Sequence, residues 1–238
     1  MKKVIVAVLV VVLITFSVLV GCGGVLTGSG NLKTEEYTFS DFTKVEISSA
    51  FEFDVSQAGS YSVIVTADDN VIDKVQVTKE GDTLKIGLKT SPSLGPMTLK
   101  TAITMPQLRG LAVSGASRGT VSDFSSAENL DLKVSGASKV TGDIMAGDAD
   151  FEVSGASTVQ LEGSANDVAA DVSGASRLNL GGFIVNNASV TFSGASNGTV
   201  NLSGKLDADL SGASKLKYIG EPTMGNINTS GASTLSKK

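Results

Sequence analysis

The chain has 238 residues, which is enough for one large domain or two small domains with a real core. It contains 27 Gly, no Trp, no His and only 5% aromatic residues, a composition typical of thin, stacked β structures. The formal net charge of −5 argues against a nucleic-acid partner, because nucleic acids are held by clusters of Lys and Arg. The absence of His excludes Ser-His-Asp triads and His-containing zinc sites.

The first twenty residues are typical of an export signal. Lys2 and Lys3 form a positively charged start, and an uncharged apolar run follows from Val4 to Val20. The run has about the minimum length for a membrane-spanning helix, so an uncleaved membrane anchor is the alternative interpretation.

The only Cys follows this run directly, in Leu19-Val20-Gly21-Cys22. This tetrapeptide resembles the lipobox of bacterial lipoproteins, in which the Cys is diacylated and becomes the first residue. We therefore expect a signal peptide over 1–21, acyl chains on Cys22 as the membrane attachment, and a linker over 22–34. Loss of the two N-terminal Lys takes the net charge from −5 to −7, so attachment would depend on the acyl chains. Gly23 after the Cys resembles sorting signals for the outer membrane or cell surface.

Residues 35–108 are expected to form short strands. Period-two alternation or short apolar runs occur at 44–47, 51–55, 61–65, 84–88 and 97–105, and no helical stripe is present. One of the intervening turns is Asp68-Asp69-Asn70, whose clustered oxygens could instead hold a hard cation. An ordinary turn rich in Asp and Asn is the simpler interpretation.

A tetrapeptide repeat dominates residues 109–235. Ser-Gly-Ala-Ser occurs seven times, with 18 to 21 residues between successive starts, at Ser114–Ser117, Ser135–Ser138, Ser154–Ser157, Ser173–Ser176, Ser193–Ser196, Ser211–Ser214 and Ser230–Ser233. A unit of this length cannot bury its own apolar face, whereas stacked copies can do so through a continuous core.

The residues before each motif share the same period. An apolar, a polar and an apolar residue precede each of the central motifs, as in Phe151-Glu152-Val153, which predicts a short strand with two inward side chains. Two or three such strands and bends are expected in each repeat. The sequence therefore predicts an all-β protein, a right-handed β-helix or solenoid of about seven coils, preceded by a strand-rich N-terminal region.

The motif itself has the chemistry of a corner. Gly permits a positive φ, and the Ser hydroxyls can bond backbone groups at the bend. Ala is expected to face inward in the tight corner, so Ala156→Leu should overpack it at a cost of about 1–3 kcal/mol.

Carboxylates are the remaining candidates for chemistry. Glu152 and Asp171 fall in one column of adjacent coils, which could form an acid pair or cation site, although two solvated outward carboxylates are the simpler interpretation. Many β-helix proteins cleave polysaccharides with carboxylates, so a polysaccharide hydrolase or lyase is the alternative function. The coils here vary by only a few residues and leave no room for the long loops on which such enzymes build their sites.

Residues 35–235 resemble the head GIN domain family, described as putative auto-transporter adhesins. The resemblance rests on Tyr37–Val45, Phe53-Asp54-Val55, Tyr61-Ser62-Val63, Ala67–Asn70, Asp82–Ile86, Pro106-x-Leu108 and the Ser-Gly-Ala-Ser turns that follow. It implies a secreted or surface-attached bacterial β-helical protein, and it brings no catalytic residues. Nothing in the sequence resembles a translocator barrel, so a lipid on Cys22 would replace the anchor of an autotransporter.

Together these observations predict a lipid-anchored cell-envelope protein that is not an enzyme and needs no cofactor or metal. Its role would be binding, adhesion or scaffolding, with a glycan or a protein as the ligand. Self-association is also expected to be possible, because the end coils of a solenoid have exposed strand edges.

Overall fold

The computed structural model describes residues 25–90 and 93–238. The expected signal peptide and Cys22 lie outside these residues. In the described part of the chain, no helix is long and apolar enough to cross a membrane. One short 3₁₀ turn, η1 (Ile72–Lys74), accompanies an otherwise β structure of two sheets.

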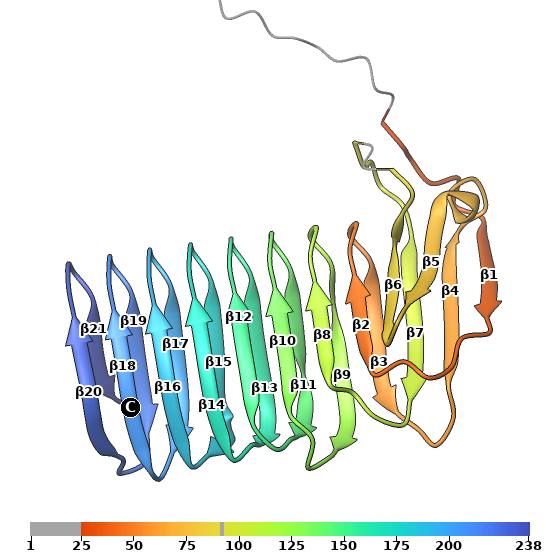
Figure 1. Cartoon of the computed structure of the whole chain (residues 1–238). Helices are drawn as coiled ribbons and strands as arrows, with labels where there is room; N and C mark the ends of the chain where they lie inside the picture. The colour runs from red at the N-terminus through yellow and green to blue at the C-terminus, as the bar shows by residue number, and fades with distance from the viewer. Residues whose placement is uncertain (1–24, 91–92) are drawn as a thin grey trace, which may run out of the picture.

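The two sheets run the length of the molecule (Figure 1). The first sheet contains, in spatial order, β1 (Leu32–Tyr37), β4 (Ser62–Asp68), β7 (Leu99–Met105), β3 (Glu52–Gln57), β9 (Arg118–Ser125), β11 (Lys139–Met145), β13 (Thr158–Ser164), β15 (Arg177–Val185), β17 (Asn197–Leu202), β19 (Lys215–Ile219) and β21 (Thr234–Lys237). The second sheet contains β5 (Val75–Glu80), β6 (Thr83–Leu88), β2 (Lys44–Ile47), β8 (Gly110–Val113), β10 (Leu130–Val134), β12 (Ala149–Val153), β14 (Asp167–Val172), β16 (Asn187–Phe192), β18 (Lys205–Leu210) and β20 (Thr223–Thr229).

The predicted β-solenoid is confirmed. Each repeat places one strand in the second sheet, turns through Ser-Gly-Ala-Ser, and places one strand in the first sheet. Neighbouring repeats pair in parallel with like positions in register, as where Val134 lies opposite Val153 and Val153 lies opposite Val172. Each repeat thus has two strands, and the solenoid is a flattened sandwich of two sheets.

The core lies between the two sheets and is continuous along the stack. The columns predicted to face inward do so: Leu132 and Val134 are buried on β10, and Phe151 and Val153 are buried on β12. Each such side chain contributes about 1.5–3 kcal/mol through removal of its apolar surface from water. Phe151 also makes an edge-to-face contact with Phe183, with the ring centroids 6.1 Å apart.

The Ser-Gly-Ala-Ser turn has the opposite orientation to the one expected for its Ala. Ala156 is exposed at the outside of the bend, and the following residue, Ser157, is 1% exposed inside it. The prediction that Ala faces inward is therefore wrong. In the first six turns, an inward Val, Phe or Leu precedes the motif, the Gly and Ala are exposed, and the fourth motif residue is the one that re-enters the core.

The expected role of Gly in the turn is confirmed, and the expected role of Ser is found in the last three turns. Gly174 has a φ of +72°, and a Cβ there would lie 2.5 Å from the carbonyl oxygen of Gly155 in the preceding coil. The Ser196 hydroxyl donates to the carbonyl oxygens of Ser193 at 2.8 Å and Val172 at 3.2 Å. The Ser214 and Ser233 hydroxyls make equivalent bonds, so each holds its own bend and joins it to the neighbouring coil. In the earlier turns the hydroxyls of Ser117, Ser138 and Ser176 are buried without a hydrogen-bond partner among the described residues.

The strand-rich N-terminal region belongs to the same two sheets and the same core. β2 and β3 form a coil whose turn, Ser48-Ser49-Ala50-Phe51, stacks directly on the first Ser-Gly-Ala-Ser turn: the Ala50 N–H donates to the Gly115 carbonyl at 2.8 Å. β6 and β7 form a further coil on the other side of β2 and β3. The spatial order of coils therefore differs from their order in the chain.

The N-terminal end of the stack is closed by antiparallel strands. β1 pairs with β4, β4 pairs with β7, and β5 pairs with β6, each antiparallel (Figure 1). Part of the segment expected to be a linker is held here, since Leu26 bridges to Leu94 and the Gly28 N–H donates to the Pro96 carbonyl at 2.9 Å.

Candidate functional site

The column that contains Glu152 and Asp171 lies on the outer face of the second sheet. The two residues are directly opposite each other on β12 and β14, as the repeat predicted. Glu152 forms an ion pair with Lys133, at 3.1 Å, and both side chains are more than half exposed. This contact raises the pKa of Lys133 above its usual value, through its hydrogen bond to Glu152. Glu152 and Asp171 are therefore solvated outward carboxylates, as the simpler interpretation predicted, and Lys133 of the adjacent coil pairs with Glu152.

Asp68 is the last residue of β4, and Asp69 and Asn70 begin the turn that follows it, as the simpler interpretation predicted. Asp68 is 2% exposed, and its carboxylate accepts hydrogen bonds from the N–H groups of Gly30 and Thr98, each at 2.7 Å. These two bonds, led by the one from Thr98, lower the pKa of Asp68. Asn70 Nδ2 donates to the Thr27 carbonyl at 2.9 Å. The Asp68 carboxylate and the Asn70 amide thus fasten the segment that precedes β1.

A ladder of Asp and Asn residues runs along the return turns, opposite the Ser-Gly-Ala-Ser corner. The backbone N–H of Asp148 donates to Asn129 Oδ1 at 3.1 Å, that of Asp167 to Asp148 Oδ1 at 3.2 Å, and that of Asn187 to Asp167 Oδ1 at 3.3 Å. Each side-chain oxygen therefore binds the next coil. The sequence carried this signal, because the four residues are 19, 19 and 20 positions apart, but no repeated tetrapeptide marks the return turns.

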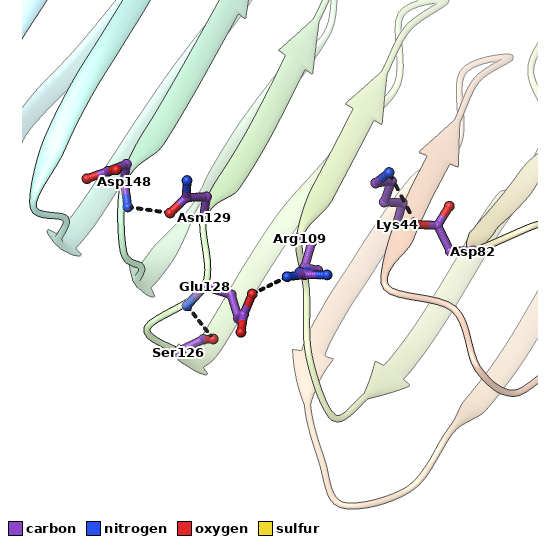
Figure 2. A network of polar contacts seen from close by, with 7 residues as sticks. All are labelled: Lys44, Asp82, Arg109, Ser126, Glu128, Asn129 and Asp148. Atoms are coloured by element: carbon purple, nitrogen blue, oxygen red, sulfur yellow. Dashed lines mark hydrogen bonds and ion pairs between the residues drawn. The ribbon is translucent and has the colours of Figure 1, made fainter.

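The ladder continues toward the N-terminal coils as ion pairs (Figure 2). Asn129 is followed by the Arg109–Glu128 pair, and Lys44 pairs with Asp82 at 3.2 Å. The Lys44 contact lowers the pKa of Asp82. These contacts take the place of the Asp and Asn ladder where the coils are less regular.

A shallow groove of about 570 Å³ follows this edge of the second sheet. Its polar lining consists mainly of carboxylates and one guanidinium: Arg109, Asp131, Asp148, Asp150, Asp167 and Asp207. Within the described ranges, no three His, Cys, Asp or Glu side chains lie close enough to hold a metal ion. The carboxylate oxygens of Asp148 and Asp167 already accept hydrogen bonds in the ladder, so the groove residues serve mainly to join neighbouring coils.

These features define a class of protein: a regular two-sheet solenoid whose outer faces carry straight rows of side chains. The chain belongs to the family described as putative auto-transporter adhesin, head GIN domain, whose model matches residues 41–222. The resemblance inferred from the sequence is thereby confirmed.

Solved structures share the fold. A putative adhesin from Bacteroides fragilis has a TM-score of 0.84 at 23% identity, over 90% of this chain and 100% of that chain. A putative adhesin from Parabacteroides merdae has a TM-score of 0.70 at 17% identity, over 90% and 98%. A putative lipid binding protein from Parabacteroides distasonis has a TM-score of 0.69 at 20% identity, over 90% and 100%. No curated protein matches the chain.

Proposed function

We propose that this protein is a non-enzymatic binding and adhesion module of the cell envelope, tethered by acyl chains on Cys22. Membership of an adhesin family supports a cell-surface role. The observation that carries the proposal is the regular stack itself: strands of neighbouring coils pair in register from β8 to β21, with only local bulges and no inserted loops. Such a stack displays long, repeating rows of side chains, which suit an extended ligand or surface.

The anchor is proposed from the lipobox-like sequence and has a direct test. Cells that express the full chain should incorporate labelled palmitate and hold the protein in the membrane fraction, and Cys22→Ser should abolish both. Gly23 belongs to the expected sorting signal, so Gly24→Ser, two residues beyond Cys22, is the matched control and should change neither. Unchanged labelling in the Cys22→Ser variant would contradict the anchor.

The binding role is tested with the detergent-solubilised full chain on arrays of glycans and of surface proteins. Specific, saturable binding to a ligand is the expected result. Absence of any binding, together with turnover of a polysaccharide, would contradict the proposal.

Nothing in the comparisons supports the alternative of a carbohydrate-active enzyme. Its test is turnover of a polysaccharide panel by the wild-type chain, lost in Asp171→Asn. We expect no turnover in either protein.

A further inference from the structure

A row of basic residues runs along the outer face of the first sheet. The residue that follows each Ser-Gly-Ala-Ser turn opens a first-sheet strand, and pairing places these residues side by side. In order along the stack they are Arg118, Lys139, Thr158, Arg177, Asn197 and Lys215. We call the four cationic members, Arg118, Lys139, Arg177 and Lys215, the basic row; all four are exposed.

The basic row is not neutralised within the described part of the protein. None of its four side chains forms an ion pair or a side-chain hydrogen bond with another described residue. Glu52 lies opposite Arg118 on β3, but its carboxylate pairs with Lys100 at 3.4 Å. Four cations of the second sheet behave differently, and each pairs with a carboxylate at 2.7–3.2 Å: Lys44, Lys85, Lys133 and Lys205. A chain with a net charge of −5 therefore leaves unpaired cations aligned on one face, although acids are plentiful elsewhere.

A neutral polar row lies beside the basic row, two residues further along each strand. Its neutral members are Thr120, Thr141, Gln160, Asn179 and Thr199, which are opposite one another in the same ladder. The ladder then continues to Lys217, an exposed cation opposite Thr199. The hydroxyl and amide groups of the neutral members can both donate and accept hydrogen bonds. Acidic residues return two residues beyond that, at Asp143 and Glu162. The favourable strip for an anion is thus narrow and straight.

The coil spacing sets the distances along this strip. Neighbouring strands of a sheet lie about 4.8 Å apart, so successive cations of the basic row are about 5, 10 and 10 Å apart. Strands β9 to β19 lie side by side in a straight stack, so the row does not wind around the molecule (Figure 1).

We propose that the basic row and the neutral polar row bind a linear acidic polysaccharide, laid along the stack across the strands. This inference rests on the proposed binding function and names its ligand class. Carboxylates of the sugar acids would meet Lys139, Arg177 and their neighbours, and ring hydroxyls would meet the neutral row. The cations recur at intervals of one or two coils, about 5 or 10 Å, so a linear polymer with a carboxylate on each ring can contact several of them at once.

Two other anions fit this strip less well. Duplex nucleic acid carries phosphates about every 3.4 Å per strand on a winding path, which matches neither the spacing nor the straightness of the row. An anionic lipid surface is a plane and would meet Asp143 and Glu162 together with the cations. A single extended chain laid along the basic and neutral rows avoids Asp143 and Glu162.

The test measures binding of fluorescent polygalacturonate oligomers to the detergent-solubilised full chain at low salt. Lys139→Gln with Arg177→Gln should weaken binding about tenfold, as expected for the loss of two charge contacts worth somewhat under 1 kcal/mol each. The matched control, Lys79→Gln with Lys89→Gln, makes the same charge change at the N-terminal end of the stack and should leave binding within about twofold. Binding should also weaken as salt increases.

A gain-of-function variant strengthens the test. Thr158→Lys with Asn197→Lys fills the two gaps between cations of the basic row and should tighten binding several-fold. Thr191→Lys with Asn228→Lys makes the same charge change on the second sheet and should not. Unchanged circular dichroism spectra establish that each variant is folded.

The proposal is overturned if wild-type protein does not bind polygalacturonate, if neutral galactan oligomers bind equally well, or if the control variants have the same effect as the row variants. It is also overturned if duplex DNA or phosphatidylglycerol vesicles bind more tightly than polygalacturonate through the same residues. An array ligand whose binding ignores the basic row would leave the proposed function standing and refute this ligand class.

Discussion

The close stacking of the Ser-Gly-Ala-Ser turns predicts that Gly174→Ala is strongly destabilising. Ala at a φ of +72° costs about 1–2 kcal/mol, because its Cβ approaches the backbone in the left-handed region. The same Cβ would lie 2.5 Å from the Gly155 carbonyl oxygen, which accepts the Ala175 N–H at 2.8 Å. Relief of this overlap separates two coils locally and adds about 1–3 kcal/mol. We expect a total loss of about 2–5 kcal/mol.

Variants at two other glycines distinguish the backbone cost from the cost of overlap with the neighbouring coil. Gly81 has a φ of +60° with no atom within 4 Å of an added Cβ, so Gly81→Ala should show only the backbone cost. Gly59 has open space and no positive φ, so Gly59→Ala should be neutral or slightly stabilising. The assay is equilibrium unfolding in urea followed by circular dichroism. Equal losses for Gly174→Ala and Gly81→Ala would refute the close stacking of the turns.

Three further predictions concern the turn and two titrating groups. Ala156→Leu should change the free energy of unfolding by less than about 0.5 kcal/mol because Ala156 is exposed, whereas Ser157→Leu should lower it by about 1–3 kcal/mol or more because Ser157 is buried. Urea unfolding of the two variants measures both effects. A larger loss for Ala156→Leu would contradict the orientation of the turn. Because the folded pKa of Asp68 is lowered, its contribution to stability is present above its unfolded pKa of about 4 and is lost as the pH falls through the folded value. Acid unfolding of Asp68→Asn should therefore begin from a lower stability and depend less on pH in this range, and an unchanged profile would contradict the role of its hydrogen bonds. Burial and the hydrogen bond to Glu35 raise the pKa of Tyr37 to about 12, so its contribution is complete below a pH of about 10 and is lost as the pH rises toward the folded value. An ultraviolet titration in which every Tyr ionises near a pH of about 10 would disprove this shift.

The repeated part of the fold was predictable from local patterns. The period of the Ser-Gly-Ala-Ser motif and the alternation before it, as in Phe151-Glu152-Val153, predicted the stack, the inward columns and the outward position of Glu152. This succeeded because each position in a stack meets its own equivalent in the next coil, so a column read along the sequence is also a column in space.

The N-terminal coils were not predictable in the same way. The turn at Ser48-Ser49-Ala50-Phe51 lacks the Gly and the final Ser of the motif, yet it stacks on the first regular turn. The coil of β6 and β7 lies beyond that of β2 and β3, although it follows them in the chain. Long-range pairing decides such an order, and the strand patterns do not encode which edge of a coil the returning chain will join.

The Ser-Gly-Ala-Ser motif and its neighbours show which features are set by the local sequence and which are set by tertiary contacts. The sequence by itself determined that the chain is a stack of β coils with Gly at each Ser-Gly-Ala-Ser bend, because periodicity and the need for a positive φ are local properties. Only the tertiary structure decided that the last Ser, and not Ala, enters the core, because one residue of turn geometry reverses which side chain faces inward. It also decided that Lys133 is neutralised by Glu152 whereas Lys139 and Arg177 are not, since charge pairing depends on which side chains meet across the ladder.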